Sequence, residues 1–164
     1  MRTAIITGAA EGLGADIARV LSAQGYRLGI LDFQADKAKA TAESLDNAVA
    51  LEADVTDAGQ IAAAFEAFGE VPDLLVNNAG IVRFGPLEEQ SVEDFTATIN
   101  INFLGSCLCA RQVAPGMLAR GSGHIVNLTS INGIHPAPNV GMYGGTKAAM
   151  AAMTQVMAVE WGPG

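Results

Sequence analysis

Short apolar runs and longer helical patterns alternate along this chain of 164 residues. The apolar runs that predict strands cover residues 3–7, 27–31, 48–53, 73–77 and 124–130. The helical patterns cover residues 12–24, 36–45, 57–67, 91–120 and 142–161. Strands that alternate with helices in this way form parallel sheets with right-handed crossovers. The pattern therefore predicts an α/β fold with a doubly wound parallel sheet.

Local signals indicate where some of these helices begin or end. Asp57 is a candidate N-cap, and Ser91 begins a capping box with Asp94 three residues later. Pro115 and Gly116 fall inside the long helical segment, and we expect them to kink or end it.

The composition favours one folded domain with a buried sheet. Half of the residues are hydrophobic and only 16% are charged, which is unlike a disordered chain. Aromatic residues make up 5%, so aliphatic side chains must fill the core, as in sheets that helices cover on both faces. A chain of this length is long enough for one domain and too short for two ordinary ones. We therefore expect residues 1–164 to form a single domain.

Charge and cysteine usage exclude several classes of function. Nine Lys and Arg against 17 Asp and Glu give a formal charge of -8 without a basic stretch, so we expect no nucleic-acid partner. No run approaches the roughly 18 apolar residues of a membrane span, and the N-terminus differs from a signal peptide. We therefore expect a cytoplasmic protein without a membrane partner. Cys107 and Cys109 lie in an apolar segment, which predicts buried thiols and neither a disulfide nor a metal site.

The glycine-rich run TGAAEGLG, residues 7–14, follows the first predicted strand and opens the first helix. A phosphate-binding turn belongs there in a mononucleotide-binding fold, because the helix N-terminus offers free N–H groups to an anion. The glycines permit a tight turn, close approach of a pyrophosphate and close helix packing. An ordinary glycine-rich turn is the alternative. The loop residues that we expect at the cofactor are Gly8, Glu11, Gly12, Leu13 and Gly14.

Asp32 closes the second predicted strand. An acidic side chain at that point of such a fold accepts hydrogen bonds from the adenosine ribose hydroxyls of NAD. The 2′-phosphate of NADP would instead meet Asp32 and Glu11, where a phosphate site would carry Arg or Lys. These charges favour NAD over NADP, although a simple loop-starting role for Asp32 is the alternative.

Three polar residues near the end of the chain indicate acid–base chemistry. Tyr143 and Lys147 are four residues apart, so they share one face of a helix. Ser130, at the end of a predicted strand, can join them. A nearby ammonium favours the phenolate form of a tyrosine, which makes this phenol a candidate general acid and base. The alternative is an amphipathic helix with two exposed polar residues, since Tyr-x-x-x-Lys alone is a weak signal.

These motifs occur in the order known from one family. With TGAAEGLG, NNAG at residues 77–80, Ser130 and Tyr143-x-x-x-Lys147, the chain resembles the short-chain dehydrogenase/reductase family, including members similar to 3-oxoacyl carrier-protein reductases. The resemblance implies a Rossmann-like sheet. It also implies hydride transfer between a nicotinamide and a small-molecule secondary alcohol or ketone.

The resemblance assigns catalytic roles residue by residue. Ser130, Tyr143 and Lys147 match the catalytic serine, tyrosine and lysine of the family. Tyr143 and Lys147 are also implied to contact the cofactor, where the lysine would hold the nicotinamide ribose. The catalytic asparagine matches Asn102, which would hold a water that relays protons from the lysine to solvent. Asn100 is a competing candidate for this role.

Two further segments are implied to border the cofactor. Asn78, Ala79 and Gly80 belong to the fourth-strand motif of the family. Asp54 and Val55 match a pair that contacts the adenine, although Asp54 could equally be a loop or capping residue.

The chain is shorter than the roughly 250 residues usual for this family. We expect a Rossmann-like sheet that is truncated after the fifth strand and its following helix, with residues 124–130 as an exposed apolar edge. The chain is either a fragment of a full-length enzyme or a short form that acts as a non-catalytic nucleotide-binding or interaction module. The family also implies a homodimer or homotetramer, paired through the long helix and the tyrosine-bearing helix.

Overall fold

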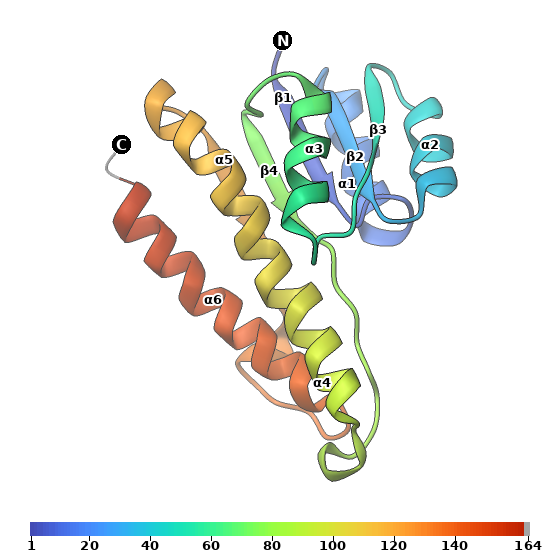
Figure 1. The fold of residues 1–164 in the computed structure, drawn as a ribbon, viewed down its shortest axis with the longest axis vertical. Coiled ribbons are helices and arrows are strands. Elements are labelled where there is room, and N and C mark those ends of the chain that lie inside the picture. Colours follow the sequence, from blue (N-terminus) through green and yellow to red (C-terminus); the bar gives the residue numbers. More distant parts are fainter. Residues whose placement is uncertain (163–164) are drawn as a thin grey trace.

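A single sheet of five parallel strands forms the centre of the computed structural model, which describes residues 1–162 (Figure 1). The strands are β1 (Thr3–Thr7), β2 (Arg27–Asp32), β3 (Ala48–Glu52), β4 (Leu74–Asn77) and β5 (His124–Asn127). Their order across the sheet is β3-β2-β1-β4-β5. The strand order therefore reverses between β1 and β4, the kind of switch point at which α/β sheets bind ligands.

Helices cover both faces of this sheet. Those described are α1 (Gly12–Ala23), α2 (Ala35–Glu43), α3 (Ala58–Phe68), α4 (Val92–Ile99), α5 (Ser106–Arg120) and α6 (Gly141–Trp161), with short 3-10 turns at Leu87–Glu89 and Ile131–Gly133. Residues of α1 and α2 belong to one core cluster, and residues of α3, α5 and α6 belong to the other. The predicted doubly wound α/β fold is confirmed. In Figure 1, α4 and the first turns of α6 extend well below the sheet.

Alternate residues of each strand face the two core clusters. On β1, Ile5 packs with α3 and α5, while Ala4 and Ile6 pack with α1 and α2. On β4, Leu75 belongs to the core cluster of α3 and α5, and Val76 belongs to that of α1 and α2. Because both faces are covered, these strands are near-continuous apolar runs, which is the pattern the sequence displays.

The capping signals are confirmed in one case and half confirmed in the other. The carboxylate of Asp57 accepts hydrogen bonds from the N–H groups of Gly59 and Gln60 at the start of α3. The hydroxyl of Ser91 accepts from the N–H of Asp94 at 3.0 Å. The Asp94 carboxylate does not reach back to the Ser91 N–H, because it accepts the Ser91 hydroxyl proton instead.

The prediction that Pro115 and Gly116 kink or end the long helix is wrong, because the helix is interrupted elsewhere. Helix α5 continues through Pro115 to Arg120. Arg111 and Pro115 both lie on the exposed face, so the carbonyl that loses its partner can bind water. The irregularity lies instead at Asn100–Gly105, a π-helical turn between α4 and α5. Such turns are uncommon and frequently mark functional sites.

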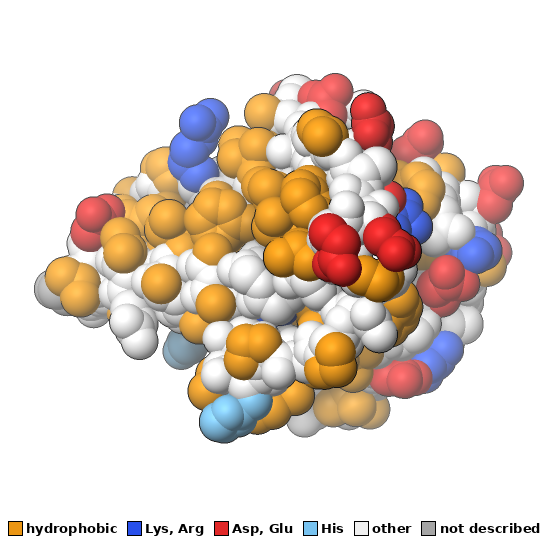
Figure 2. Space-filling view, turned by 90° about the horizontal axis from the view of Figure 1, so that it is seen from below, with side chains coloured by type: hydrophobic (Ala, Val, Ile, Leu, Met, Phe, Trp, Pro, Cys, Tyr) orange, Lys and Arg blue, Asp and Glu red, His pale blue; other side chains and the backbone are white. Residues whose placement is uncertain are grey.

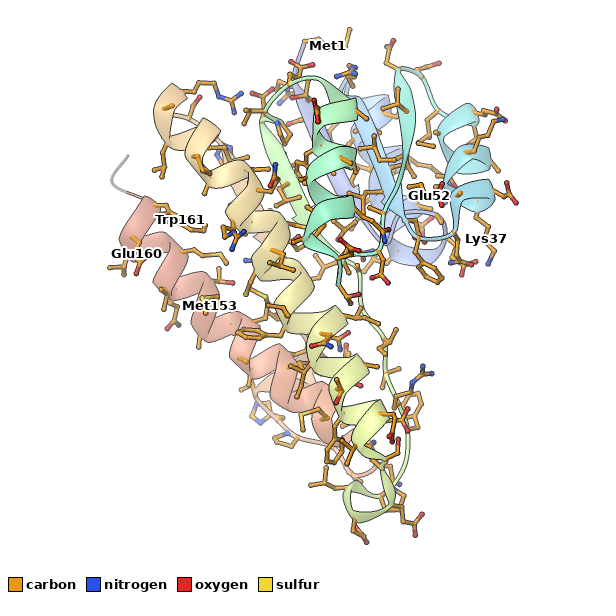
Figure 3. The ribbon with its side chains drawn as sticks, viewed as in Figure 1. Met1, Lys37, Glu52, Met153, Glu160 and Trp161 are labelled. Carbon is orange, nitrogen blue, oxygen red and sulfur yellow. The ribbon has the colours of Figure 1, made fainter. Side chains whose placement is uncertain are left out.

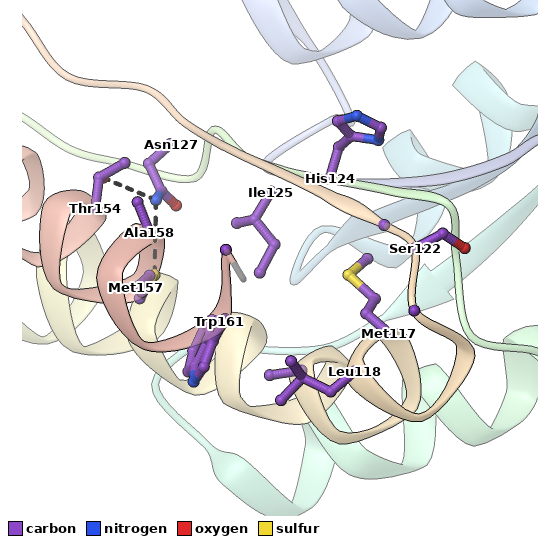
Figure 4. Close-up of a pocket in the computed structure, with 14 residues that line it drawn as sticks. Met117, Leu118, Ser122, His124, Ile125, Asn127, Thr154, Met157, Ala158 and Trp161 are labelled. Carbon is purple, nitrogen blue, oxygen red and sulfur yellow. Dashed lines mark hydrogen bonds between the residues drawn. The ribbon is translucent and has the colours of Figure 1, made fainter. Parts of the chain in front are cut away.

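The β5 edge of the sheet is shorter than predicted. Regular strand ends at Asn127, and residues 128–130 are irregular. On the face that α1 and α2 cover elsewhere, Val126 is 46% exposed. A cavity of about 530 Å³ lies along β5 between α5 and α6 and is lined by Met117, Ile125 and Trp161 among others (Figure 4). β5 is therefore an edge strand of four residues, as expected, but Val126 is its one exposed apolar side chain.

Across residues 1–162, every helix is too short or too polar to cross a membrane.

Candidate active site

A cleft of about 540 Å³ lies at the carboxyl ends of β1, β2, β3 and β4. This volume is in the range of small-molecule sites in proteins. Its lining residues are Gly8, Glu11, Leu13, Asp32, Phe33, Gln34, Ala53, Asp54, Val55, Asn78, Ala79, Gly80, Ile81 and Ile101. The predicted cofactor residues that do not line it are Gly12, Gly14, Tyr143 and Lys147. Segments far apart in the sequence thus meet where the sheet order reverses.

The glycine loop packs closely against the end of β4. Gly8 has φ +63, and a Cβ there would lie 2.7 Å from Ala79 Cα. A Cβ at Gly14 would overlap the carbonyl oxygen of Gly8. At Gly12 no atom lies within 4 Å of the Cβ position, so the loop is open on that side. The loop therefore combines tight contact with the sheet and free space beside the N-terminus of α1, as a phosphate cradle requires.

Thr7 and Asn78 hold the two sides of the cleft together. Asn78 Nδ2 donates to the carbonyls of Thr7 and Gly8, each at 2.9 Å. The N–H groups of Asn78 and Ala79 donate to Thr7 Oγ1 at 3.1 and 3.0 Å. These four bonds fix the glycine loop on the NNAG segment.

Asp32 is 6% exposed and lies at the end of β2. Its Oδ2 accepts from the N–H of Ala10 at 3.1 Å, and its Oδ1 accepts from the N–H of Gln34 at 3.0 Å. A carboxylate has about four acceptor positions, so ribose hydroxyls could still bind to it. The side chain therefore braces the glycine loop and also lines the cleft. A structural role at the start of the loop and a role in binding the ribose are thus compatible.

Asp54 and Val55 reach the cleft from the end of β3. Asp54 Oδ1 accepts from the N–H and from the hydroxyl of Thr56, both at 2.8 Å. Val55 is buried and packs against Gly105 of the π-helical turn. Asp54 therefore stabilises its own loop while it borders the cleft.

The structure distinguishes Asn102 from Asn100. Asn102 is fully buried, and its Nδ2 donates to Ile81 O at 2.8 Å and to Thr146 Oγ1 at 3.3 Å. Its Oδ1 accepts from the N–H of Ile81 at 2.7 Å. Asn100 is only half-buried and lines a separate shallow pocket beside α4. Asn102 is thus the asparagine that joins the cleft wall to α6, and a relay water could bind its side chain only through the second lone pair of Oδ1.

Lys147 is 6% exposed and lies one helical turn from Tyr143 on α6. Its Nζ donates to Leu128 O at 2.8 Å and lies 5.7 Å from the centroid of the Tyr143 ring. The Cβ position of Gly80 is 3.6 Å from the same Nζ, which places the ammonium at the cleft wall. Burial lowers the pKa of Lys147, because desolvation disfavours the charged form.

Ser130 and Tyr143 lie on neighbouring segments and form no direct bond. Ser130 Oγ accepts from the N–H of Asn132 at 3.2 Å and caps a short 3-10 turn. That turn packs on α6, where a Cβ at Gly144 would lie 2.8 Å from Asn132 O. Within residues 1–162, no hydrogen bond joins the Tyr143 hydroxyl to Ser130 or Lys147. Both side chains are half-buried, so a substrate oxygen can reach them.

Some residues of the site were not anticipated from the sequence. They are Thr7 and Thr146, which form the bonds described above, and Phe33, Gln34, Ala53, Ile81 and Ile101, which line the cleft. Most of them adjoin a predicted residue in the sequence, so extending each motif by one or two positions would have included them.

Comparison with known proteins gives a consistent result. A model of the short chain dehydrogenase family matches residues 2–164. The chain is 36% identical to D-threitol dehydrogenase of Mycolicibacterium smegmatis, over 98% of this chain and 65% of that protein. It is 37% identical to 2-(R)-hydroxypropyl-CoM dehydrogenase of Xanthobacter autotrophicus, over 98% of this chain and 68% of that protein. The chain thus spans about two thirds of the length of these relatives.

Solved structures share the same fold. A 3-oxoacyl-[acyl-carrier protein] reductase with bound NAD from Brucella melitensis matches with a TM-score of 0.94 and 32% identity, over 99% of this chain and 66% of that one. A gluconate 5-dehydrogenase from Burkholderia cenocepacia, in complex with NADP and tartrate, matches with a TM-score of 0.91 and 36% identity, over 98% and 66%. With its five-stranded Rossmann-like sheet and the family match along nearly its whole length, this chain belongs to the short-chain dehydrogenase family.

Proposed function

We propose that the protein is an NAD-dependent oxidoreductase that transfers hydride between a nicotinamide and a secondary alcohol or ketone, with Tyr143 as general acid and base. The environment of Lys147 is the observation that carries this proposal. Its ammonium is buried, and no carboxylate pairs with it among residues 1–162. A buried, unpaired cation costs stability, so its position beside Tyr143 and the cleft favours a catalytic role.

The cleft fits a dinucleotide. Gly8, Glu11 and Leu13 bring the glycine loop and the N-terminus of α1 to the cleft, where backbone N–H groups can bind a pyrophosphate. Asp32 lies at the next strand end along the cleft, where ribose hydroxyls would reach it. The similar solved structures hold NAD in one case and NADP in the other. The acidic side chains Glu11 and Asp32 favour NAD, because a 2′-phosphate would be repelled there.

The residues near Tyr143 divide the acid–base work. A bound nicotinamide would supply the hydride acceptor or donor. In the oxidation direction the Tyr143 phenolate takes the hydroxyl proton of the alcohol, and in reduction the phenol returns a proton to the carbonyl oxygen. Lys147 stabilises the phenolate by its charge, and its remaining N–H groups can hold ribose hydroxyls. Ser130 can donate its hydroxyl proton to the substrate oxygen, and Asn102 positions Ile81 in the cleft wall.

The names of the relatives support the substrate class. D-threitol and 2-(R)-hydroxypropyl-CoM each carry a secondary hydroxyl group, and the relatives are named as dehydrogenases of these compounds. A secondary alcohol and its ketone are therefore the substrate pair to test first.

We also propose a homodimer or homotetramer built on α4, α5 and α6. Large apolar side chains are exposed on these helices, at Val92 and Ile99 of α4, Leu118 of α5, and Val156 and Val159 of α6. Figure 2 shows hydrophobic side chains gathered over the centre and left of one face, while most charged side chains lie toward its right. Exposed apolar surface of this kind is typical of protein interfaces. Sedimentation of the full-length protein as a monomer alone would contradict this arrangement.

The test of the enzymatic function is NADH formation by the full-length protein against a panel of secondary alcohols. Tyr143→Phe should lower turnover by about 100-fold to 10,000-fold, the usual contribution of a general acid or base. Its affinity for NAD should change little, since the ring remains. Tyr26→Phe is the matched control, because Tyr26 packs under Arg2 away from the cleft. Unchanged turnover in Tyr143→Phe would exclude the mechanism.

A second candidate is a non-catalytic nucleotide-binding or interaction module. The open β5 edge and the cavity beside it favour this possibility, since such surfaces can receive another strand (Figure 4). The module would bind NAD saturably without turnover. Turnover by the isolated 164-residue chain would exclude it.

A further inference from the structure

An ion pair joins the glycine loop to α2 at the rim of the cleft. Lys37 Nζ donates to Glu11 Oε2 at 2.9 Å, and the side chains of Lys37 and Glu11 are 53% and 64% exposed. Figure 3 shows Lys37 at the end of α2 that follows β2. Glu11 lines the cleft and Lys37 does not. The hydrogen bond and the charge of Lys37 lower the pKa of Glu11, so the pair is ionic at neutral pH.

The ion pair lies at a cleft whose lining is acidic. The ionisable side chains that line the cleft are all acidic, namely Glu11, Asp32 and Asp54. Asp32 is buried and holds backbone N–H groups of the loop, so it cannot move without breaking them. Glu11 is exposed and can move, and its partner is the cation at this end of the cleft.

We propose that Glu11 helps to set the preference for NAD by occupying Lys37, which is a masked phosphate-binding residue. This inference rests on the proposed function and adds Lys37 to the repulsion of a 2′-phosphate by Glu11 and Asp32. With Glu11 in place, a 2′-phosphate meets carboxylates, and the charge of Lys37 is already neutralised. Without the Glu11 carboxylate, Lys37 is free to bind that phosphate. An exposed ion pair contributes little stability, so the exchange of partners costs little.

The inference predicts that the effect of Glu11 depends on Lys37. Affinities for NAD and NADP should be measured by titration calorimetry on the 164-residue chain with Glu11→Gln, Lys37→Met and the double variant. Glu11→Gln should raise NADP affinity about tenfold, the size expected of one charge-assisted hydrogen bond. It should change NAD affinity less than about twofold. In the Lys37→Met background the same substitution should change NADP affinity less than about twofold.

The other outcomes are decisive as well. An equal gain in NADP affinity in both backgrounds would show that Glu11 acts only by repulsion, and no gain in either would show that it has no role; both overturn the inference.

Asp16→Asn is the matched control, because Asp16 pairs with Arg19 on the exposed side of α1 and should leave the ratio of affinities unchanged. Failure of the unaltered chain to bind NAD would contradict the proposed function together with this inference. Normal NAD binding with an unaltered ratio in Glu11→Gln would contradict the inference alone.

Discussion

Asn102 pairs with both backbone groups of Ile81. Its Oδ1 accepts from the Ile81 N–H at 2.7 Å, and its Nδ2 donates to the Ile81 carbonyl at 2.8 Å. The asparagine lies in the π-helical turn between α4 and α5, and Ile81 directly follows the NNAG segment after β4. Through Thr146, this buried amide also holds the cleft wall against α6, the helix that carries Tyr143 and Lys147.

Asn102→Ala should lower the free energy of unfolding by about 2 kcal/mol, because the two half-buried backbone groups of Ile81 lose their partner. Asn100→Ala is the matched control two residues away. Asn100 is half-buried and makes no side-chain hydrogen bond among residues 1–162, so its substitution should change stability by less than about 0.5 kcal/mol. Urea unfolding measures both, and equal losses would contradict the assignment.

Gly8→Ala should be far more costly than Gly25→Ala. Both glycines have positive φ, at +63 and +80. A methyl group at Gly8 would also press on the backbone of Ala79, whereas Gly25 has no atom within 4 Å of its Cβ position. We expect a loss of about 1 kcal/mol at Gly25 from the backbone alone and about 3 kcal/mol at Gly8. NAD affinity, measured by titration, should fall only for Gly8→Ala. Thermal unfolding measures the stability losses, and a larger loss at Gly25 than at Gly8 would contradict this prediction.

Asp32→Ala should reduce the preference for NAD over NADP, since the carboxylate that opposes a 2′-phosphate is removed. The same change leaves the N–H groups of Ala10 and Gln34 without acceptors, so stability should fall by about 1–3 kcal/mol. Asp32→Asn keeps one acceptor oxygen but turns its NH2 group toward the other N–H, so it should reduce the preference while it retains only part of this stability. Calorimetric affinities for the two nucleotides provide the measurement. An unaltered ratio in both variants would mean that Asp32 has only its structural role.

Cys109 should make stability depend on pH in alkaline solution. Burial raises its pKa from 9.0 to about 12, so the folded state keeps the thiol protonated where the unfolded chain forms the thiolate. The unfolded state then binds fewer protons, and the contribution of this group is present below its usual pKa and lost as pH rises toward 12. Cys109→Ala should show a shallower fall in unfolding free energy between pH 8.5 and about 10.5.

Cys107→Ala is the control for this measurement. Burial raises the pKa of Cys107 as well, but that thiol is only half-buried, so the slope should change less. A larger change for Cys107 than for Cys109 would contradict the assigned burial.

Local pattern was enough to predict the elements of this fold. β1 matches the predicted residues 3–7, and α6 begins within one residue of the predicted position. Period-two and period-3.6 patterns act over a few residues, so they can be recognised without knowledge of the fold. The strand predicted at residues 124–130 stops at Asn127, because only the part that pairs with β4 is regular strand.

The glycine loop, Asp32 and the Tyr143–Lys147 spacing could likewise be recognised in the sequence, since each motif lies within one element or at one strand end. The contacts that bring these motifs together could not be recognised in the sequence. The parallel strand order brings the ends of β1 through β4 to one cleft, and this depends on pairings between segments far apart in the chain.

The sequence by itself determined the strand and helix order, the family motifs and the residue types available for acid–base chemistry, because these follow from short-range spacing. Only the tertiary structure shows that Asn102 is buried against Ile81 and Thr146 while Asn100 is half-buried beside a separate pocket. The π-helical turn sets which of the two side chains faces Ile81 and Thr146, and no spacing rule predicts such a turn. The tertiary structure also paired Glu11 with Lys37 and left Pro115 inside α5. In each case the outcome depends on which distant surfaces pack together and on which carbonyls and charges remain in contact with water.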